Sequence, residues 1–198
     1  NITAFAIDEK SEDLIIGTIN GVFAISHFKQ FIIDAPSNIV NGESLYYKVL
    51  DESNSIIVSG SDINFVKNNL QVTRKINLPF LVGKNSSNKI SFEINANKLY
   101  IATSNLYEVD LTSAAITQIP LATKSVISNA ISNLKIIGND LYISLPEGVA
   151  VLNTNTKSIT RYQYDPLINK NIPKGFEDIE QINDQLWVSN SESGLYLF

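Results

Sequence analysis

Apolar residues along this chain come in short runs separated by polar turn residues, and they rarely recur at the three- and four-residue spacing of a helix face. Runs of about four to eight apolar residues between turn formers are typical of β-strands. β-Branched residues, which favour strands, are abundant. The pattern therefore predicts a protein built from strands, with almost no helix.

The same order of strands repeats five times. Each repeat has an apolar pair, one small residue, a short polar loop and a second apolar run, and the small residues are Gly17, Ser59, Ala102, Ser144 and Ser189. Their spacings of 42, 43, 42 and 45 residues are too regular for chance. A period of about 40 residues with four strands per unit is typical of β-propeller blades. A small residue suits the second strand, because that strand is expected to be buried between neighbouring sheets.

Turn residues divide each repeat into strands. First strands are expected at residues 3–7, 45–50, 90–94, 134–137 and 179–182, and fourth strands at 30–33, 71–76, 115–119 and 158–162. The last repeat reaches residue 198 after its third strand. We therefore predict an all-β fold, a β-propeller segment over residues 1–198 that is part of a larger propeller. Its five four-stranded antiparallel blades are expected near residues 1–37, 38–81, 82–122, 123–166 and 167–198.

Composition narrows the chemistry that the chain can perform. It has no cysteine and one histidine, so disulfides, thiol nucleophiles and Cys-ligated zinc or iron–sulfur sites are excluded. With 15 Lys+Arg and 20 Asp+Glu the net charge is −5, and no basic cluster is present, which disfavours nucleic-acid binding. No run approaches the roughly 18 to 20 apolar residues of a membrane span. Because the chain opens on Asn1 within a strand-like pattern, we interpret it as a piece of a longer polypeptide.

Three segments resemble the repeat of two-component regulator propellers, whose pattern is roughly L-W-I-G-T-x-x-G-L-x-x-[FY]. They are residues 15–22 (IIGTINGV), 100–106 (YIATSNL) and 186–195 (LWVSNSESGL). Trp187 is the single copy of the family's aromatic residue, and the second repeat has Asp62-Ile63 where Gly-Leu is usual. The resemblance implies more than five units and a place in the periplasmic or extracellular region of a sensor histidine kinase of the hybrid type. It also implies carbohydrate-related signals and a homodimer of the full receptor.

One face of such a propeller carries the loops from which ligand contacts are expected. Connections between blades and turns between second and third strands share that face. The stretches concerned are residues 36–43, 80–88, 123–129 and 165–175. The candidate ligand-binding residues are Asn20, Asp62, Asn105, Glu147, Glu192 and Tyr164. No catalytic residue, metal ligand or cofactor is assigned from the sequence.

Three functions remain open. The first is a noncatalytic module that senses or binds a small molecule, a carbohydrate or a protein partner. The second is a structural or protein-interaction scaffold, which exposed aromatic residues on broad loops would favour. The third is a metal-dependent hydrolase or lyase, which needs carboxylates such as Asp62, Glu147 and Glu192 to converge over a central channel. The single histidine, His27, lacks spacing partners and is interpreted as a surface residue.

Overall fold

The computed structural model of the chain consists of antiparallel sheets, and it forms two compact units, Asn1–Asn88 (unit 1) and Lys89–Phe198 (unit 2). The structure describes residues 2–8, 13–25, 37–41, 43–67, 71–84, 89–121, 131–145, 148–163, 176–182, 185–190 and 194–197. The only helical element in these ranges is a short 3-10 helix, η2 (Pro79–Leu81). The expectation of strands with almost no helix is therefore confirmed for the described part of the chain.

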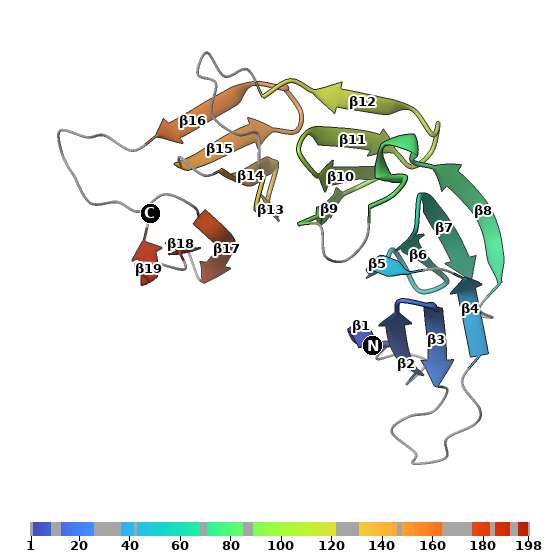
Figure 1. Cartoon of the computed structure of the whole chain (residues 1–198). Coiled ribbons are helices and arrows are strands. Elements are labelled where there is room, and N and C mark those ends of the chain that lie inside the picture. The colour runs from blue at the N-terminus through green and yellow to red at the C-terminus, as the bar shows by residue number, and fades with distance from the viewer. Residues whose placement is uncertain are drawn as a thin grey trace. The chain divides into compact units, whose positions relative to one another are not determined.

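Unit 1 contains two four-stranded sheets (Figure 1). The first has the order β1 (Ile2–Asp8), β2 (Asp13–Thr18), β3 (Gly21–Ile25) and β4 (Ser37–Asn41). The second has the order β5 (Ser44–Val49), β6 (Asn54–Ser59), β7 (Asp62–Lys67) and β8 (Val72–Asn77). Within each sheet every strand pairs with the next one along the chain, and short turns join β2 to β3 and β6 to β7.

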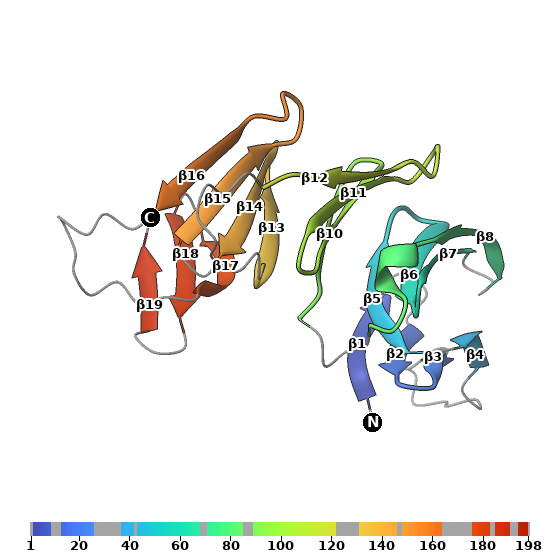
Figure 2. The same cartoon turned by 45° about the horizontal axis from the view of Figure 1, so that its top comes forward.

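Unit 2 contains three sheets, which Figure 2 shows from a second direction. The first two have four strands each: β9 (Ser91–Asn95), β10 (Lys98–Ala102), β11 (Leu106–Asp110) and β12 (Ile116–Ile119), then β13 (Asn133–Ile137), β14 (Asp140–Leu145), β15 (Gly148–Asn153) and β16 (Ile159–Gln163). The third has three: β17 (Phe176–Ile182), β18 (Gln185–Asn190) and β19 (Gly194–Leu197). The expected three-stranded last repeat is thus present.

The structure differs from the prediction at the end of the first sheet. The expected fourth strand at 30–33 lies outside the described residues, and the strand β4, which was not predicted, is present at Ser37–Asn41. β4 pairs with β3, as in the Val22–Val40 pair. The first sheet therefore extends beyond the predicted blade end at residue 37, and most of the predicted loop 36–43 is strand. Val40, which is 8% exposed, supplies the apolar contact that holds this strand against the sheet.

Second strands are deeply buried, most clearly β6 and β10. Leu99, Tyr100 and Ile101 follow one another in β10 and are each 1% exposed or less, so both faces of that strand are covered. The small residues of the repeat have the burial that this position requires. Gly17, Ser59, Ala102 and Ser144 are buried, and Ser189 is half-buried. The predicted reason for their size, close packing of the second strand between sheets, is consistent with this burial.

Candidate functional site

Polar side chains recur at one position on the first strands of unit 2. β9, β13 and β17 are each the edge strand of their sheet, and β13 has both of the others as neighbours. The residue that pairs with the small residue of each repeat is Ser91 opposite Ala102, Asn133 opposite Ser144 and Asp178 opposite Ser189. The repeat therefore places one polar side chain at the same height on three neighbouring strands.

Hydrogen bonds join these three side chains across the sheets. The Ser91 hydroxyl donates to Asn133 Oδ1 at 2.7 Å, and Asn133 Nδ2 donates to Asp178 Oδ1. The backbone N–H of Leu134 donates to Ser91 Oγ at 3.0 Å, and that of Ile179 donates to Asp178 Oδ1 at 2.9 Å. The Asn133 amide thus forms hydrogen bonds to side chains of both neighbouring sheets, and these bonds orient its oxygen and its nitrogen.

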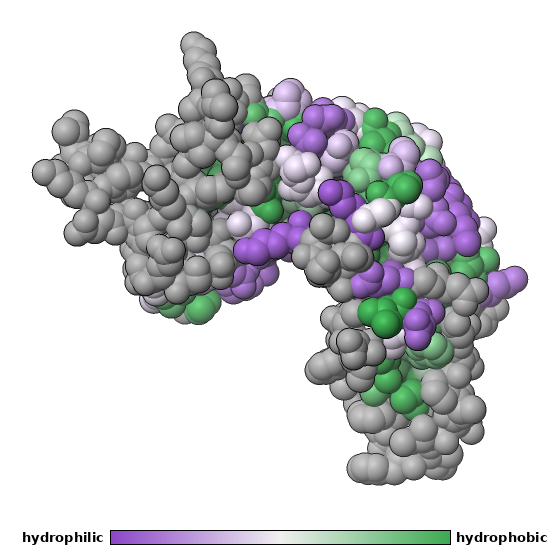
Figure 3. Space-filling view, in the orientation of Figure 1, coloured by the Kyte–Doolittle hydropathy of each residue, from purple (hydrophilic) through white to green (hydrophobic). Residues whose placement is uncertain are grey.

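A second pair of polar side chains lies two residues further along the same strands. Lys135 Nζ is 2.8 Å from Glu180 Oε2. Lys135 pairs with Tyr142 and Glu180 with Trp187, so both lie on the same face of their strands as Asn133 and Asp178. We call Ser91, Asn133, Lys135, Asp178 and Glu180 the first-strand polar row. Hydrophilic side chains reach the surface over β13 and β17 in Figure 3.

The row remains open to solvent on its β17 side. Asp178 is exposed, and the side chains of Lys135 and Glu180 are 29% and 57% exposed. The indole nitrogen of Trp187, on the strand position that pairs with Glu180, is buried and has no hydrogen-bond partner among the described residues. The row therefore presents an ammonium group, two carboxylates and an amide near a buried N–H donor that a ligand acceptor could satisfy.

Of the predicted site residues, Asn105 lies next to this level of the unit 2 sheets. Asn105 belongs to the turn that follows Ala102 in β10, so it lies at the same end of its sheet as Ser91. Its backbone N–H donates to Thr103 Oγ1 at 3.3 Å. Asn105 thus lies in a turn at the sheet end that carries Ser91, and its role in ligand binding stays a prediction.

In unit 1, Asn20 lies in the turn between β2 and β3, and Asp62 is the first residue of β7, directly after the turn from β6. Asn20 is exposed, and its backbone N–H donates to Thr18 Oγ1 at 3.1 Å. Asp62 Oδ1 accepts a hydrogen bond from Asn77 Nδ2 at 3.0 Å, which ties the turn to β8. Glu147, Glu192 and Tyr164 lie outside the described residues, as does His27.

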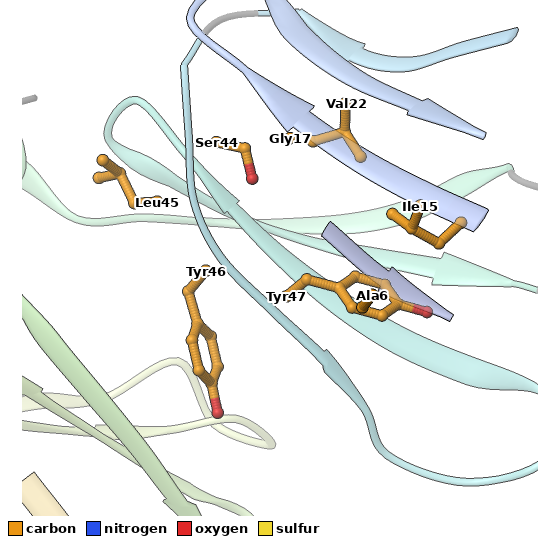
Figure 4. Close-up of a pocket in the computed structure, with 8 residues that line it drawn as sticks. All are labelled: Ala6, Ile15, Gly17, Val22, Ser44, Leu45, Tyr46 and Tyr47. Carbon is orange, nitrogen blue, oxygen red and sulfur yellow. The ribbon is translucent and has the colours of Figure 1, made fainter. Parts of the chain in front are cut away.

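Unit 1 has a pocket where unit 2 has charged residues. At the positions of Ser91 and Asn133, unit 1 has Ala4 and Ser44, and at the positions of Lys135 and Glu180 it has Ala6 and Tyr47. A pocket of about 200 Å³ opens there between the two sheets, and Figure 4 shows its walls. It is lined by Ala6, Ile15, Gly17, Val22, Ser44, Leu45, Tyr46 and Tyr47.

A further cluster of charges lies at the opposite end of the unit 2 sheets. Glu108 in β11 is 8% exposed, and Lys98 Nζ is 3.1 Å from its Oε1. Lys157, in the turn between β15 and β16, reaches across to Glu108 Oε2 and lies 5.7 Å above the Tyr100 ring. Burial raises the pKa of Glu108, but hydrogen bonds from Lys157 and Lys98 outweigh it and hold that pKa below its usual value.

The same cluster shifts the pKa values of two neighbouring groups, Tyr100 and Asp110. Burial, followed by the negative charge of Glu108, raises the pKa of the Tyr100 hydroxyl well above its usual value. Hydrogen bonds from the backbone of Ser113 and from Lys98 lower the pKa of Asp110. Each charge in the cluster has an opposite partner, which is typical of a structural ion cluster between sheets.

The sequence contains a signal for the first-strand polar row in the spacing of its residues. Ser91 and Asn133 are 42 residues apart, and Asn133 and Asp178 are 45 apart, the same spacings as the small residues. Lys135 and Glu180 are also 45 apart. Polar residues in an otherwise apolar strand, repeated at the blade period, would have identified the row. The expectation that ligand contacts lie in loops directed attention away from the strands.

The described residues contain neither a metal-binding cluster nor a membrane-spanning helix. No three His, Cys, Asp or Glu side chains among them lie close enough together to hold a metal ion. In the ranges given above, no helix has the length and apolar character needed to cross a membrane.

Comparisons with known proteins identify the fold. No family model matches the sequence, and no curated protein matches it either. Solved structures do match. The chain aligns over its full length with the extracellular domains assigned to two hybrid two-component systems of B. thetaiotaomicron, at TM-scores of 0.68 and 0.66 and identities of 14% and 11%. It also aligns over its full length with the Cps50 β-propeller domain of Myceliophteria thermophila, at a TM-score of 0.69 and 10% identity.

These likenesses show that the chain has a β-propeller fold, as the repeat predicts. At such low sequence identities the likenesses show the fold alone. The chain spans 27% and 26% of the lengths of the two extracellular domains and 64% of the Cps50 domain.

Proposed function

We propose that this chain is a noncatalytic propeller segment that binds a ligand outside the cytoplasm for a two-component signalling receptor. The observation that carries the proposal is the first-strand polar row, a set of hydrogen-bonded and charged side chains on three neighbouring strands that remains open to solvent. The motif resemblance and the likeness to extracellular domains of hybrid two-component systems support the location and the receptor context. A homodimer of the full receptor belongs to the same proposal.

The chemistry of the row favours a small polar ligand. Lys135 and Glu180 offer a cation and an anion 2.8 Å apart, and Asp178 adds a second carboxylate beside the Asn133 amide. Hydroxyl groups, which both donate and accept, can replace these mutual contacts one for one, as can an ammonium or carboxylate group. A carbohydrate or another small polar molecule fits this set of donors and acceptors.

A ligand screen with matched variants tests the proposal. The chain is heated with a panel of sugars, amino acids and organic acids, and a true ligand at about 100 times its Kd raises the Tm by about 5 °C or more. We expect that shift to disappear in Lys135→Ala and in Glu180→Ala. Lys75→Ala, which removes an exposed lysine on β8, is the control and keeps the shift.

Two outcomes contradict the proposal. One is a panel in which no compound shifts the Tm. The other is a ligand whose shift survives in both row variants, which would place its binding elsewhere on the chain.

The second candidate function, a protein-interaction scaffold, is favoured by exposed apolar side chains in unit 2. Tyr162 in β16, Ile182 in β17 and Leu195 in β19 are 56%, 52% and 60% exposed. Exposed apolar residues of this size are common at protein–protein contacts. If protein docking is the function, Tyr162→Ser and Leu195→Ser abolish co-purification of a partner with the full-length protein, whereas the row variants leave it unchanged.

A further inference from the structure

We propose that the pocket in unit 1 binds a neutral, largely apolar group about the size of one substituted six-membered ring. The inference rests on the proposed function, because it names the class of ligand, or of ligand part, that a second site on the same propeller would take. It concerns unit 1 alone and uses none of the residues of the first-strand polar row.

The lining of the pocket determines its chemistry. None of the eight lining residues is charged, and the apolar walls come from Ile15 and Val22 of the first sheet. In Figure 4 both of these side chains face the same space as the Tyr47 ring, which lies beside Ala6, while Tyr46 points away from them. Ser44 and Tyr47 bring hydroxyl groups to the wall. An ionic group would lose its hydration here without gaining a charged partner, so a neutral ligand is favoured.

The small size of two residues creates the space. The Ala6 position carries Lys135 and Glu180 in the last two sheets of unit 2, and Gly17 replaces the Ser144 and Ser189 of those sheets. In this part of unit 1 the repeat thus has its smallest side chains at two adjacent positions. The deeper contacts between the two sheets are nevertheless intact, because Val22, at 1% exposure, and Ile57, at 0%, belong to one buried cluster together with Ile15.

The volume sets the size of the occupant. A dry cavity of about 150 Å³ is large enough for benzene, whereas pockets for whole drug-sized ligands measure about 300 to 1,000 Å³. The pocket here, at about 200 Å³, lies between these limits. It accommodates one ring with a short substituent, and a hydroxyl on that ring can reach the Ser44 and Tyr47 side of the wall.

Binding of simple probes to the isotope-labelled chain tests the inference. Phenol, cyclohexanol and the benzylammonium ion are titrated in turn while backbone amide signals are followed by NMR. We expect phenol and cyclohexanol to shift the amide signals near Ala6, Gly17, Val22 and Ser44. The shifts should saturate with a Kd of about 1 mM, a common affinity for ligands with so few heavy atoms. The benzylammonium ion should bind at least about tenfold more weakly, because its charge finds no partner there.

Variants then locate the site. Ala6→Leu, on β1, places a larger side chain in the pocket and should abolish the saturable shifts, whereas Lys48→Leu, on an exposed position of β5, should keep them. If Ala6→Leu does not fold, Ser44→Ala replaces it, and phenol should then bind more weakly than to the wild-type chain. Saturable binding that persists in the pocket variant, equal binding of the cation, or the absence of saturable binding would each overturn the inference.

The two proposals fail in distinguishable ways. If the probes do not bind but a panel ligand still depends on Lys135 and Glu180, only the pocket inference is wrong. If the probes bind while the panel gives no ligand that depends on the row, the pocket stands and the proposed function of the row does not.

Discussion

Replacing Glu108 by glutamine provides a quantitative test of how the sheets of unit 2 are held together. The substitution keeps the shape of the side chain and removes its charge, which leaves Lys157 without its carboxylate partner. Lys98 retains Asp110 Oδ2 at 3.0 Å. The expected loss therefore comes mainly from the contact between Lys157 and Glu108, together with part of the contact between Lys98 and Glu108.

The size of the loss in unfolding free energy follows from the distance between the charges and from the exposure of their side chains. Opposite charges 3.1 Å apart attract by about 5 kcal/mol at an effective dielectric constant of about 20. Desolvation of Glu108, whose side chain is 11% exposed, cancels much of this attraction, and the lysine side chains, 34% and 47% exposed, lose entropy when they are held in place. We expect a net loss of about 1 to 2 kcal/mol in the free energy of unfolding at pH 7.

Urea unfolding followed by tryptophan fluorescence measures this loss. Trp187 is the single tryptophan and lies in β18, so its signal reports on unit 2. A loss of this size lowers the urea midpoint by about 0.5 to 1 M. Glu180→Gln is the control, because the same chemical change at a carboxylate that is 57% exposed should cost less than about 1 kcal/mol.

The pH dependence gives a second and independent check. Because the folded-state pKa of Glu108 is lowered, its charge stabilises the fold above its unfolded-state pKa, and this contribution is lost as the pH falls through the folded-state value. The difference between wild type and Glu108→Gln should therefore be full at pH 7 and shrink once the pH drops below about 4.3. An equal difference at pH 7 and at pH 3, or no difference at pH 7, would refute the assignment of a stabilising ion cluster.

Two further predictions concern packing and backbone conformation in unit 2. Leu141→Ala, at a residue with 0% exposure, should lower the free energy of unfolding by about 3 kcal/mol in the same urea titration. The control Ile116→Ala, at 37% exposure, should cost less than about 1 kcal/mol. Similar losses in the two variants would mean that the β14 core is not packed as described. Gly138 has φ +60° and open space around the position of a Cβ, so Gly138→Ala should cost about 1 kcal/mol through backbone strain alone. Ala114 already adopts φ 62°, and Ala114→Gly should therefore cause no loss of thermal stability, a result that calorimetry can check and that a clear drop in Tm would contradict.

The local sequence pattern was sufficient to predict the positions of most of the strands. First and second strands of every repeat lie within a few residues of their expected positions, because short apolar runs between turn formers have few alternatives to strand. The first sheet shows the limit of this reasoning. β4, at Ser37–Asn41, was not predicted as a strand, yet it forms where Val40 reaches a buried cluster shared with the next sheet. Burial against a neighbouring sheet, which the local pattern does not contain, decided the pairing.

The candidate ligand-binding residues from the sequence stay a prediction, and the first-strand polar row was not among them. Asn105 is at the same end of its sheet as Ser91, but the side chains that meet across sheets come from the first strands, not from the turns. The spacing of Ser91, Asn133 and Asp178 in the sequence follows the blade period. The pairing of Lys135 with Glu180 and the contact of Lys157 with Glu108 could not be assigned from that period, since each joins two sheets whose relative rotation is set by packing.

Repetition along the chain thus establishes the strands, the antiparallel order and the positions that every blade shares, since these depend on residues close together in sequence. The chemical difference between a charged row on β13 and β17 and an uncharged pocket beside β1 and β5 emerges only when neighbouring sheets are packed. Cross-sheet contacts join residues some forty or more positions apart, and burial determines which of those side chains keep a partner, which remain open to solvent and where space is left between them.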